Sequence, residues 1–263
     1  MEYITERYES LNAFAKALER ERVGYLSHDF DSEFIGVKDE ETANKLFLYG
    51  DEKTVHLIQD AKINAKIKKR ERTAKKTTVY RSQCGFIPNI GAVMAGHPLN
   101  MLNVKQEPKK TKVLNLAYLV GCSWKYKSAE LAQAGEKMLN IVNTLEARGY
   151  RVNLYAADVS HPTINHKTND TGKVVTVLVK IKDAGKHLNI SKIAYPLANP
   201  AFFRYHIFKW YDTIIKDATN AFGVSNDEIT KALHKFFPKN CAWESFYTVR
   251  NKTEKEILEN IFK

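Results

Sequence analysis

The strongest constraint on the fold is an almost uninterrupted apolar run, VLNLAYLV, at residues 113–120. Its one strong polar break is Asn115. An apolar run of this length is typical of a strand that is buried on both faces, and such strands belong to sheets covered by helices on both sides. The run therefore predicts the central strand of a largely parallel α/β sheet.

The segments after this run alternate between helical and extended patterns. Apolar residues from Leu131 to Leu145 recur at helical spacing and predict a helix over residues 127–148, with Ser128 as N-cap and Gly149 at its end. Further strands are expected at residues 151–156, 173–182 and 244–250, and further helices at residues 200–222, 225–237 and 253–262. Such alternation indicates parallel crossovers. We expect an α/β domain over residues 112–263, with a mainly parallel sheet flanked by helices.

Residues 1–105 have a different pattern. Amphipathic spacing predicts a helix over residues 10–22, and two more helices are expected after Asp39 and Asp51. A short helix is expected to begin at Pro88 and to end before Gly96. The sequence thus predicts a mostly helical N-terminal region over residues 1–105, joined to the α/β domain by a linker at residues 106–112.

The formal net charge of +11 is concentrated in one segment. Residues 53–76 contain nine Lys and Arg against two acidic residues, so their net charge is 9 − 2 = +7. Such a segment either contacts nucleic acid or another polyanion, or is a solvated helix end that runs into a linker. The candidate contact residues are Lys62, Lys66, Lys68, Lys69, Arg70, Arg72 and Lys76.

The composition argues against several classes of protein. The three cysteines, Cys84, Cys122 and Cys241, are far apart and form no CxxC pair, so neither a disulfide framework nor a zinc site is indicated. No apolar stretch is long enough to span a membrane, and the acidic, polar N-terminus does not resemble a signal peptide. We expect a soluble cytoplasmic protein that does not bind membranes.

The loop at residues 121–128 follows the central strand, where open parallel sheets commonly bind ligands. It is neither a P-loop nor a GxGxxG turn. The backbone amides of Gly121 and Ser123 lie close to a predicted helix N-terminus and could hold an anion. Alternatively, Gly121 only makes a turn and Ser128 only caps the helix.

Two other segments carry side chains with functional potential. His161 and His166 lie with two aspartates in the sequence DVSHPTINHKTND, which is either a transition-metal site or a polar surface loop. The aromatic segment that begins at Phe202 either stacks nucleic-acid bases or forms a core-facing helix. In the second case Phe203, Ile207 and Trp210 face the core, and the exposed minority is Phe202, Tyr205 and Lys209.

Longer phrases point to a family. The sequences LEARGYRV, VVTVLVKIKDAGKHLNISKIAYPLANPAFFR and GFIPNIGAVMAGHPLNML make the chain similar to a family of uncharacterised, phage-encoded proteins. The C-terminal half of that family resembles a von Willebrand factor A-type (vWA) domain. The resemblance implies a vWA/Rossmann-like fold for residues 112–263.

The resemblance also implies a position for a metal site. In vWA domains an Asp-x-Ser-x-Ser sequence after the first strand contributes ligands to a divalent cation, and these positions correspond to Leu119, Gly121 and Ser123. Neither Leu119 nor Gly121 has a side-chain oxygen, and oxygen ligands are what Mg²⁺ requires. We therefore expect a degenerate loop formed by Gly121, Ser123 and Ser128, with no bound metal and no cofactor.

Two functions compete on this basis. The first is a non-catalytic accessory protein that docks a protein partner, which the resemblance implies is a ring ATPase of the MoxR or cobalt-chelatase kind or a component of a phage particle. The alternative is a nucleic-acid-binding accessory protein that uses the basic segment. An enzyme ranks last, because no set of nucleophile, base and metal ligands is evident.

Overall fold

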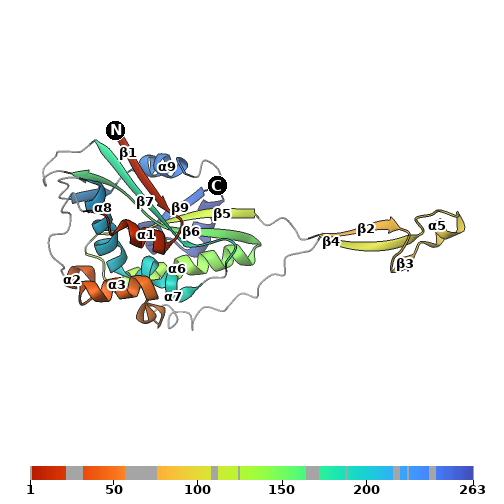
Figure 1. Ribbon diagram of the computed structural model, residues 1–263, viewed down its shortest axis with the longest axis horizontal. Helices are drawn as coiled ribbons and strands as arrows, with labels where there is room; N and C mark the ends of the chain where they lie inside the picture. The colour runs from red at the N-terminus through yellow and green to blue at the C-terminus, as the bar shows by residue number, and fades with distance from the viewer. Residues whose placement is uncertain are drawn as a thin grey trace.

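The computed structural model describes most of the chain and shows two sheets of different size (Figure 1). The described residues are 2–21, 32–56, 76–107, 112–123, 125–163, 172–186, 189–215, 220–223, 225–236 and 241–262. We use the name main body for all of these except residues 76–107. None of the described helices is both long and apolar enough to cross a membrane.

The large sheet combines strands from both ends of the sequence. Its strands are β1 (Glu2–Tyr8), β5 (Lys112–Leu119), β6 (Tyr150–Thr163), β7 (Lys173–Lys182), β8 (Asn220–Gly223) and β9 (Cys241–Ser245). Their order is β1-β7-β6-β5-β9, and β8 pairs with the end of β6. The pairs β1/β7, β5/β6 and β5/β9 are parallel, which confirms the expected α/β class with a mainly parallel sheet. However, β6, which no expected helix separates from β7, is antiparallel to it.

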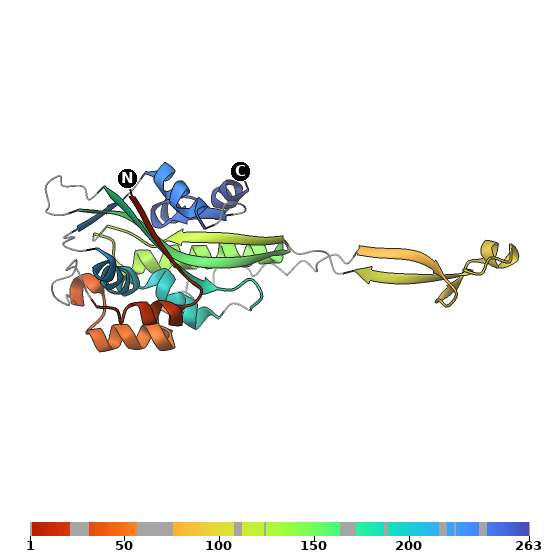
Figure 2. The same cartoon turned by 45° about the horizontal axis from the view of Figure 1, so that its top comes forward.

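Helices cover both faces of the large sheet. They are α1 (Leu11–Ala17), α2 (Ser32–Ile35), α3 (Glu40–Tyr49), α6 (Ser128–Ala147), α7 (Ile190–Ala198), the π-helix η1 (Phe202–Ile207), α8 (Phe208–Ile214), α9 (Asn226–His234), α10 (Phe246–Asn251) and α11 (Glu254–Ile261). The larger core cluster contains residues of α1, α3, α6, α7, η1 and α8, whereas α9 contributes to a smaller cluster. Figure 2 shows α1 and α3 (red and orange) on one side of the sheet and α9 (blue) on the other.

Strand β5 is an interior strand of this sheet, between β6 and the edge strand β9. Leu116 and Tyr118 belong to the larger core cluster, whereas Ala117 and Leu119 belong to the smaller one. Successive side chains of a strand point to opposite faces, so helices on both sides require apolar residues at every position. The prediction of a strand buried on both faces is therefore confirmed, although β5 lies next to the edge strand β9 rather than at the centre of the sheet and Val113 at its beginning is 49% exposed.

Helix α6 connects the parallel strands β5 and β6, close to the predicted bounds. It ends just before Gly149, whose φ of 88° is accessible to glycine at little cost. The predicted N-cap was wrong by one position: Ser128 is the first residue of the helix, and Lys127 precedes it as the cap residue. The Lys127 amide donates to Glu130 Oε2 over 3.1 Å, so a carboxylate three residues on bonds the cap residue's amide.

The aromatic segment is not the single helix expected over residues 200–222. It comprises η1, α8 and the short strand β8, and the bond from the Phe208 amide to the Phe203 carbonyl spans five residues, as in a π-helix. The longer turn changes which residues face inward. As a result Phe202 and Tyr205, which we expected on the surface, are buried.

The last expected strand, at residues 244–250, is also corrected. Strand β9 ends at Ser245, and the chain then forms α10. The Ser245 hydroxyl accepts a hydrogen bond from the Thr248 amide over 3.2 Å. This N-cap starts a helix where apolar and aromatic residues alone suggested a strand.

The mostly helical N-terminal region expected over residues 1–105 is not supported. Strand β1 pairs in parallel with β7 along all of its residues. Phe14 of α1 and Phe47 of α3 are buried in the larger core cluster. The described residues between 2 and 49 therefore belong to the same body as the residues after 112, because they complete its sheet and one of its core faces.

The smaller sheet is formed by residues 76–107, which we call the arm. It contains β2 (Lys76–Ser82), β3 (Ile87–Pro88), the short helix α5 (Ile90–Met94) and β4 (Met101–Glu107). The strand order is β2-β4-β3, and both pairs are antiparallel. No described residue of the arm belongs to either core cluster. Figures 1 and 2 show the arm projecting away from the main body.

Candidate functional site

The candidate site is the loop between β5 and α6, at the carboxyl end of β5 and beside Ala157 and Asp158 of the parallel strand β6. The Val120 amide donates to the Ala157 carbonyl over 2.9 Å, which continues the pairing of the two strands into the loop. The Ser123 amide donates to the Tyr247 hydroxyl over 2.9 Å. Protein groups therefore bond this loop on two sides.

Position 121 requires a glycine because a neighbouring side chain lies very close to its backbone, and not because the chain turns there. A Cβ atom at this position would lie only 2.4 Å from Asp158 Oδ1, a distance that real Cβ atoms do not tolerate. The Asp158 carboxylate thus occupies the space next to the loop that any larger residue at position 121 would need.

The Asp158 carboxyl is buried and hydrogen-bonded within the protein. Ser160 Oγ donates to its Oδ2 over 2.6 Å, and the Tyr211 hydroxyl donates to the same oxygen. Burial raises the pKa of Asp158, although both hydrogen bonds act in the opposite direction. Burial also raises the pKa of the neighbouring Cys122 thiol, with Arg204 acting against it. A thiol with a raised pKa is a poor nucleophile at neutral pH.

Arg204 supplies a positive charge to the loop from the π-helix η1. One terminal nitrogen of its guanidinium donates to the carbonyls of Ser123 and Tyr126, over 3.1 Å each, and the other donates to the Phe34 carbonyl over 2.8 Å. The guanidinium also lies 4.9 Å from the centre of the Phe34 ring. The side chain is almost completely buried, so a fixed cation bonds the loop after β5 to α2 and η1.

The positions expected to resemble a metal site have other roles. Leu119 packs in the smaller core cluster, Gly121 makes room for Asp158, and Ser123 engages Tyr247 and Arg204 through its backbone. Ser128 lies close to Gly36, where a Cβ atom would be 3.4 Å from its hydroxyl oxygen. Among the described residues no three His, Cys, Asp or Glu side chains are grouped so that they could hold a metal ion.

The outer side of the loop carries an aromatic and basic surface, which we call the loop face. The rings of Tyr126 and Tyr247 are 5.8 Å apart and meet edge to face. The Arg250 guanidinium lies 5.1 Å from the centre of the Tyr126 ring, and Lys125 Nζ lies 5.5 Å from it. Tyr247 is exposed, so this surface is accessible to a partner.

The other sequence candidates are only partly described. Lys76 opens β2, whereas Lys62, Lys66, Lys68, Lys69, Arg70 and Arg72 lie outside the described residues. His161 lies on β6, where its Nε2 is 3.0 Å from Glu228 Oε1 and its Nδ1 is 3.1 Å from the Lys173 carbonyl. Both ring nitrogens are thus engaged within the protein. His166 and Asp170 are also outside the described residues.

Sequence patterns did not connect Arg204 or Asp158 with this loop, although the two side chains dominate the geometry of the site: Asp158 was grouped with His161 as part of a candidate metal loop. Arg204 was counted only as a basic residue among aromatics, and its contacts lie 78 and 81 residues away in the sequence. A charged residue inside an otherwise aromatic and apolar segment, FFRYHI, was the available signal.

Together these features define an α/β protein with a mainly parallel sheet flanked by helices, in which a buried guanidinium bonds the loop after the interior strand β5. The model of a protein family described as a domain of unknown function, DUF7192, matches residues 2–260, and the chain belongs to this family. The match includes β1, the arm and the loop after β5. Comparison with curated proteins and with solved structures found no match.

Proposed function

We propose that this chain is a non-catalytic, phage-type accessory protein that docks a protein partner through a vWA-like α/β domain with a degenerate metal site. The observation that carries the proposal is the guanidinium of Arg204 in the loop after β5. Three backbone carbonyls accept hydrogen bonds from it, so a built-in cation holds the loop in shape. A loop stabilised in this way can present a surface without a metal ion.

The loop face suits a docking role in its composition. Tyr and Arg are enriched among the residues that dominate the binding energy of protein interfaces. Tyr247 is exposed and its hydroxyl is already fixed by the Ser123 amide, which limits the entropy lost on binding. The resemblance to phage-encoded proteins suggests a ring ATPase or a particle component as the partner.

Affinity purification of the full-length chain from cells that encode it tests the docking function. We expect one identified protein to co-purify and to bind again when both components are pure. Replacing Tyr247 and Arg250 together by alanine should weaken this binding at least tenfold, whereas Tyr49→Ala, an exposed position on α3, should not. If no purified protein binds the chain, the docking function is wrong.

We also predict that the loop after β5 has no tight site for a divalent metal. The reason is that Leu119 and Gly121 replace oxygen ligands, and hard cations require oxygen. Titration calorimetry with Mg²⁺ or Mn²⁺ should show no binding tighter than about millimolar, the weak end of the range for oxygen sites. A micromolar isotherm that disappears in Ser123→Ala would contradict the prediction.

Nucleic-acid binding through the basic segment is the second candidate, supported by the charge of residues 53–76. Binding through phosphate contacts alone would be roughly 10⁻⁴–10⁻⁶ M at physiological salt and would carry no sequence preference. We expect the chain to elute early from heparin as salt increases, and a variant with Lys66, Lys68, Lys69 and Arg70 changed to Glu to lose all retention.

We expect the fold of that variant to stay intact, because Lys and Arg are almost never fully buried unless they are paired, and charges at a surface contribute little to stability. Its thermal unfolding therefore serves as the control. Nanomolar binding of a specific DNA or RNA at physiological salt would instead require recognition of bases or shape. That result would place nucleic-acid binding ahead of protein docking.

A further inference from the structure

The arm has almost no core of its own. Among its residues 78–105 the only buried side chain is Ala92. The arm also carries most of the exposed large apolar side chains of the described chain: Val79, Tyr80, Phe86, Ile87, Ile90, Val93, Met94, Leu99 and Val104. Monomeric proteins rarely expose contiguous apolar surface on this scale unless a partner covers it.

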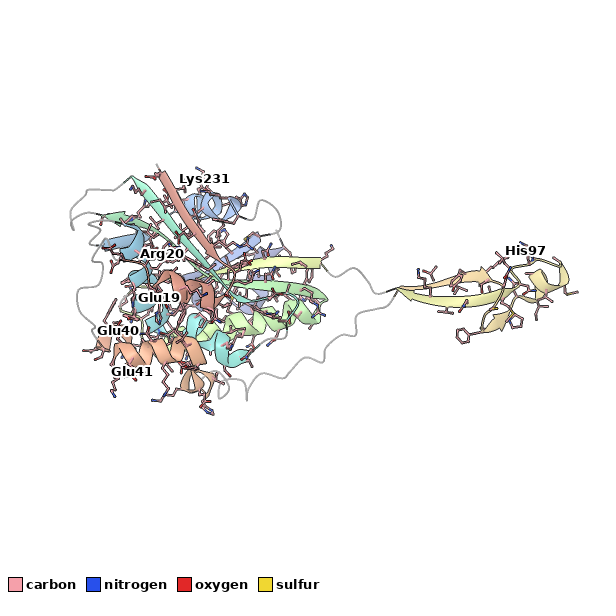
Figure 3. All side chains as sticks on the ribbon, in the orientation of Figure 1. Glu19, Arg20, Glu40, Glu41, His97 and Lys231 are labelled. Carbon is pink, nitrogen blue, oxygen red and sulfur yellow. The ribbon has the colours of Figure 1, made fainter. Side chains whose placement is uncertain are left out.

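The apolar surface is concentrated at one end of the arm, residues 86–99, which we call the tip. Phe86 is 83% exposed and Met94 is 84% exposed. From Ser82 to Val104 the sequence contains no Asp, Glu, Lys or Arg. Figure 3 labels His97, the one titratable side chain of the tip, and shows it on the arm, away from the main body.

The tip is nevertheless built as a defined structure. The Asn89 side chain caps the N-terminus of α5. The helix ends in a Schellman motif, in which the backbone amide of Gly96 (φ 64°) donates to the Val93 carbonyl and that of His97 donates to the Ala92 carbonyl. Gly85, directly before the tip, lies so close to β4 that a Cβ atom at this position would be 2.3 Å from the Leu102 carbonyl oxygen. An apolar surface that is held in place by its backbone binds with little loss of conformational entropy.

A membrane fits this surface poorly. The order β2-β4-β3 leaves an open edge along β2 and another along the part of β4 that β3 does not reach. Open sheet edges are not tolerated in the hydrocarbon region, because their amides and carbonyls would have no partners there. Water or another polypeptide can satisfy these groups. A bilayer would therefore cover the tip but leave Val79, Tyr80 and Val104 on the strands behind it exposed.

A second copy of the chain also fits less well. Pairing of two β2 edges would satisfy backbone groups but would leave Phe86 and Met94 uncovered, since both lie beyond the end of β2. It would also bring together two chains that each carry a net charge of +11.

Charge indicates the chemistry of the partner. The strands at the base of the arm carry the exposed side chains Arg81 and Lys105, and residues 78–105 contain no acidic residue, so their net charge is 2 − 0 = +2. An apolar tip above a basic base matches a cleft with an apolar floor and an acidic rim. Resting on the docking function above, we infer that the tip of the arm inserts into such a cleft on the protein partner.

Site-specific photo-crosslinking in the full-length chain tests this inference. The chain carries p-benzoylphenylalanine at position 94 and is expressed in the cells that encode it. We expect a covalent adduct with one protein, identified by mass spectrometry and then purified. In a binding assay with pure components, Phe86→Ser/Met94→Ser should weaken the affinity for that protein at least tenfold, and added salt should weaken the wild-type affinity.

The matched control is Tyr49→Ser/Val113→Ser, which removes two exposed apolar side chains from the main body. It should bind as tightly as the wild type. Both double variants should unfold at the wild-type temperature, because none of the four positions belongs to a core cluster.

The failing outcomes separate the two proposals. If Phe86→Ser/Met94→Ser binds the partner as tightly as the wild type, the arm is not the docking element, but the docking function stands. If the chain binds no protein at all, both fail. An adduct between two copies of the 30.1 kDa chain, or flotation of the wild type but not the variant with phosphatidylglycerol vesicles, would also overturn the inference.

Discussion

A chain carrying Leu116→Asp is expected not to fold. Leu116 is fully buried in β5, opposite Leu154 of β6 and Ala242 of β9. An unpaired carboxylate at this position costs several kcal/mol. The whole free energy of folding of a protein is about 5–15 kcal/mol, so the single change removes most of it. Circular dichroism during heating should show no cooperative transition.

The control is Val113→Asp in the same strand. Val113 lies at the exposed beginning of β5, where a carboxylate remains in contact with water. This variant should unfold within a few degrees of the wild type, since exposed substitutions change stability by about 0.5 kcal/mol or less. Equal melting temperatures for wild type and Leu116→Asp would mean that β5 is not an interior strand buried on both faces.

The second large effect is expected for Arg204→Met. The substitution keeps a long side chain but leaves the carbonyls of Phe34, Ser123 and Tyr126 without this donor. A buried acceptor that loses its partner costs about 1–3 kcal/mol. Since the loop can relax and admit water, we expect a total loss of about 3 kcal/mol in the free energy of unfolding. Urea denaturation measures this loss.

Arg148→Met serves as the control, because Arg148 is exposed at the end of α6. Its effect should stay within about 0.5 kcal/mol. The stability of Arg204→Lys should fall between those of the wild type and Arg204→Met, since an ammonium restores the charge but not the planar fork of donors. If Arg204→Met is as stable as the wild type, the guanidinium does not support the loop.

The elements that sequence reasoning predicted well are those with strong local signals. The bounds of β7 agree with the predicted strand at residues 173–182, where apolar residues form a continuous run. Helices α9 and α11 begin after the caps Ser225 and Thr253, each paired with a glutamate three residues later. Periodicity and capping are encoded within a few neighbouring residues, so one sequence is enough to find them.

The elements that were missed depend on distant contacts. Strand β1, EYITERY, mixes apolar and charged residues because it lies at an edge of the sheet, and its pairing with β7 joins residues far apart in the chain. The π-helix shifts the buried side from the periodic pattern to Phe202 and Tyr205. Local propensity does not report either effect.

The candidate site shows the same division. The sequence located the loop after β5 and the positions Gly121 and Ser123, because a glycine and a serine after an apolar strand are a local signal. It did not reveal that Asp158 fills the space beside Gly121 or that Arg204 reaches the loop from η1. The arm was also visible only as a segment rich in turn-forming residues, since its exposure is a property of the folded chain.

Docking through a loop that needs no metal is tested most directly by measuring the affinity for the partner in excess EDTA and again in excess Mg²⁺. We expect the same affinity in both conditions, because Arg204 supplies the cation of the loop permanently. It also predicts a loss of at least tenfold in both conditions for Arg204→Met, at a temperature where that variant remains folded. Binding that requires Mg²⁺ and is unaffected by Arg204→Met would contradict the account.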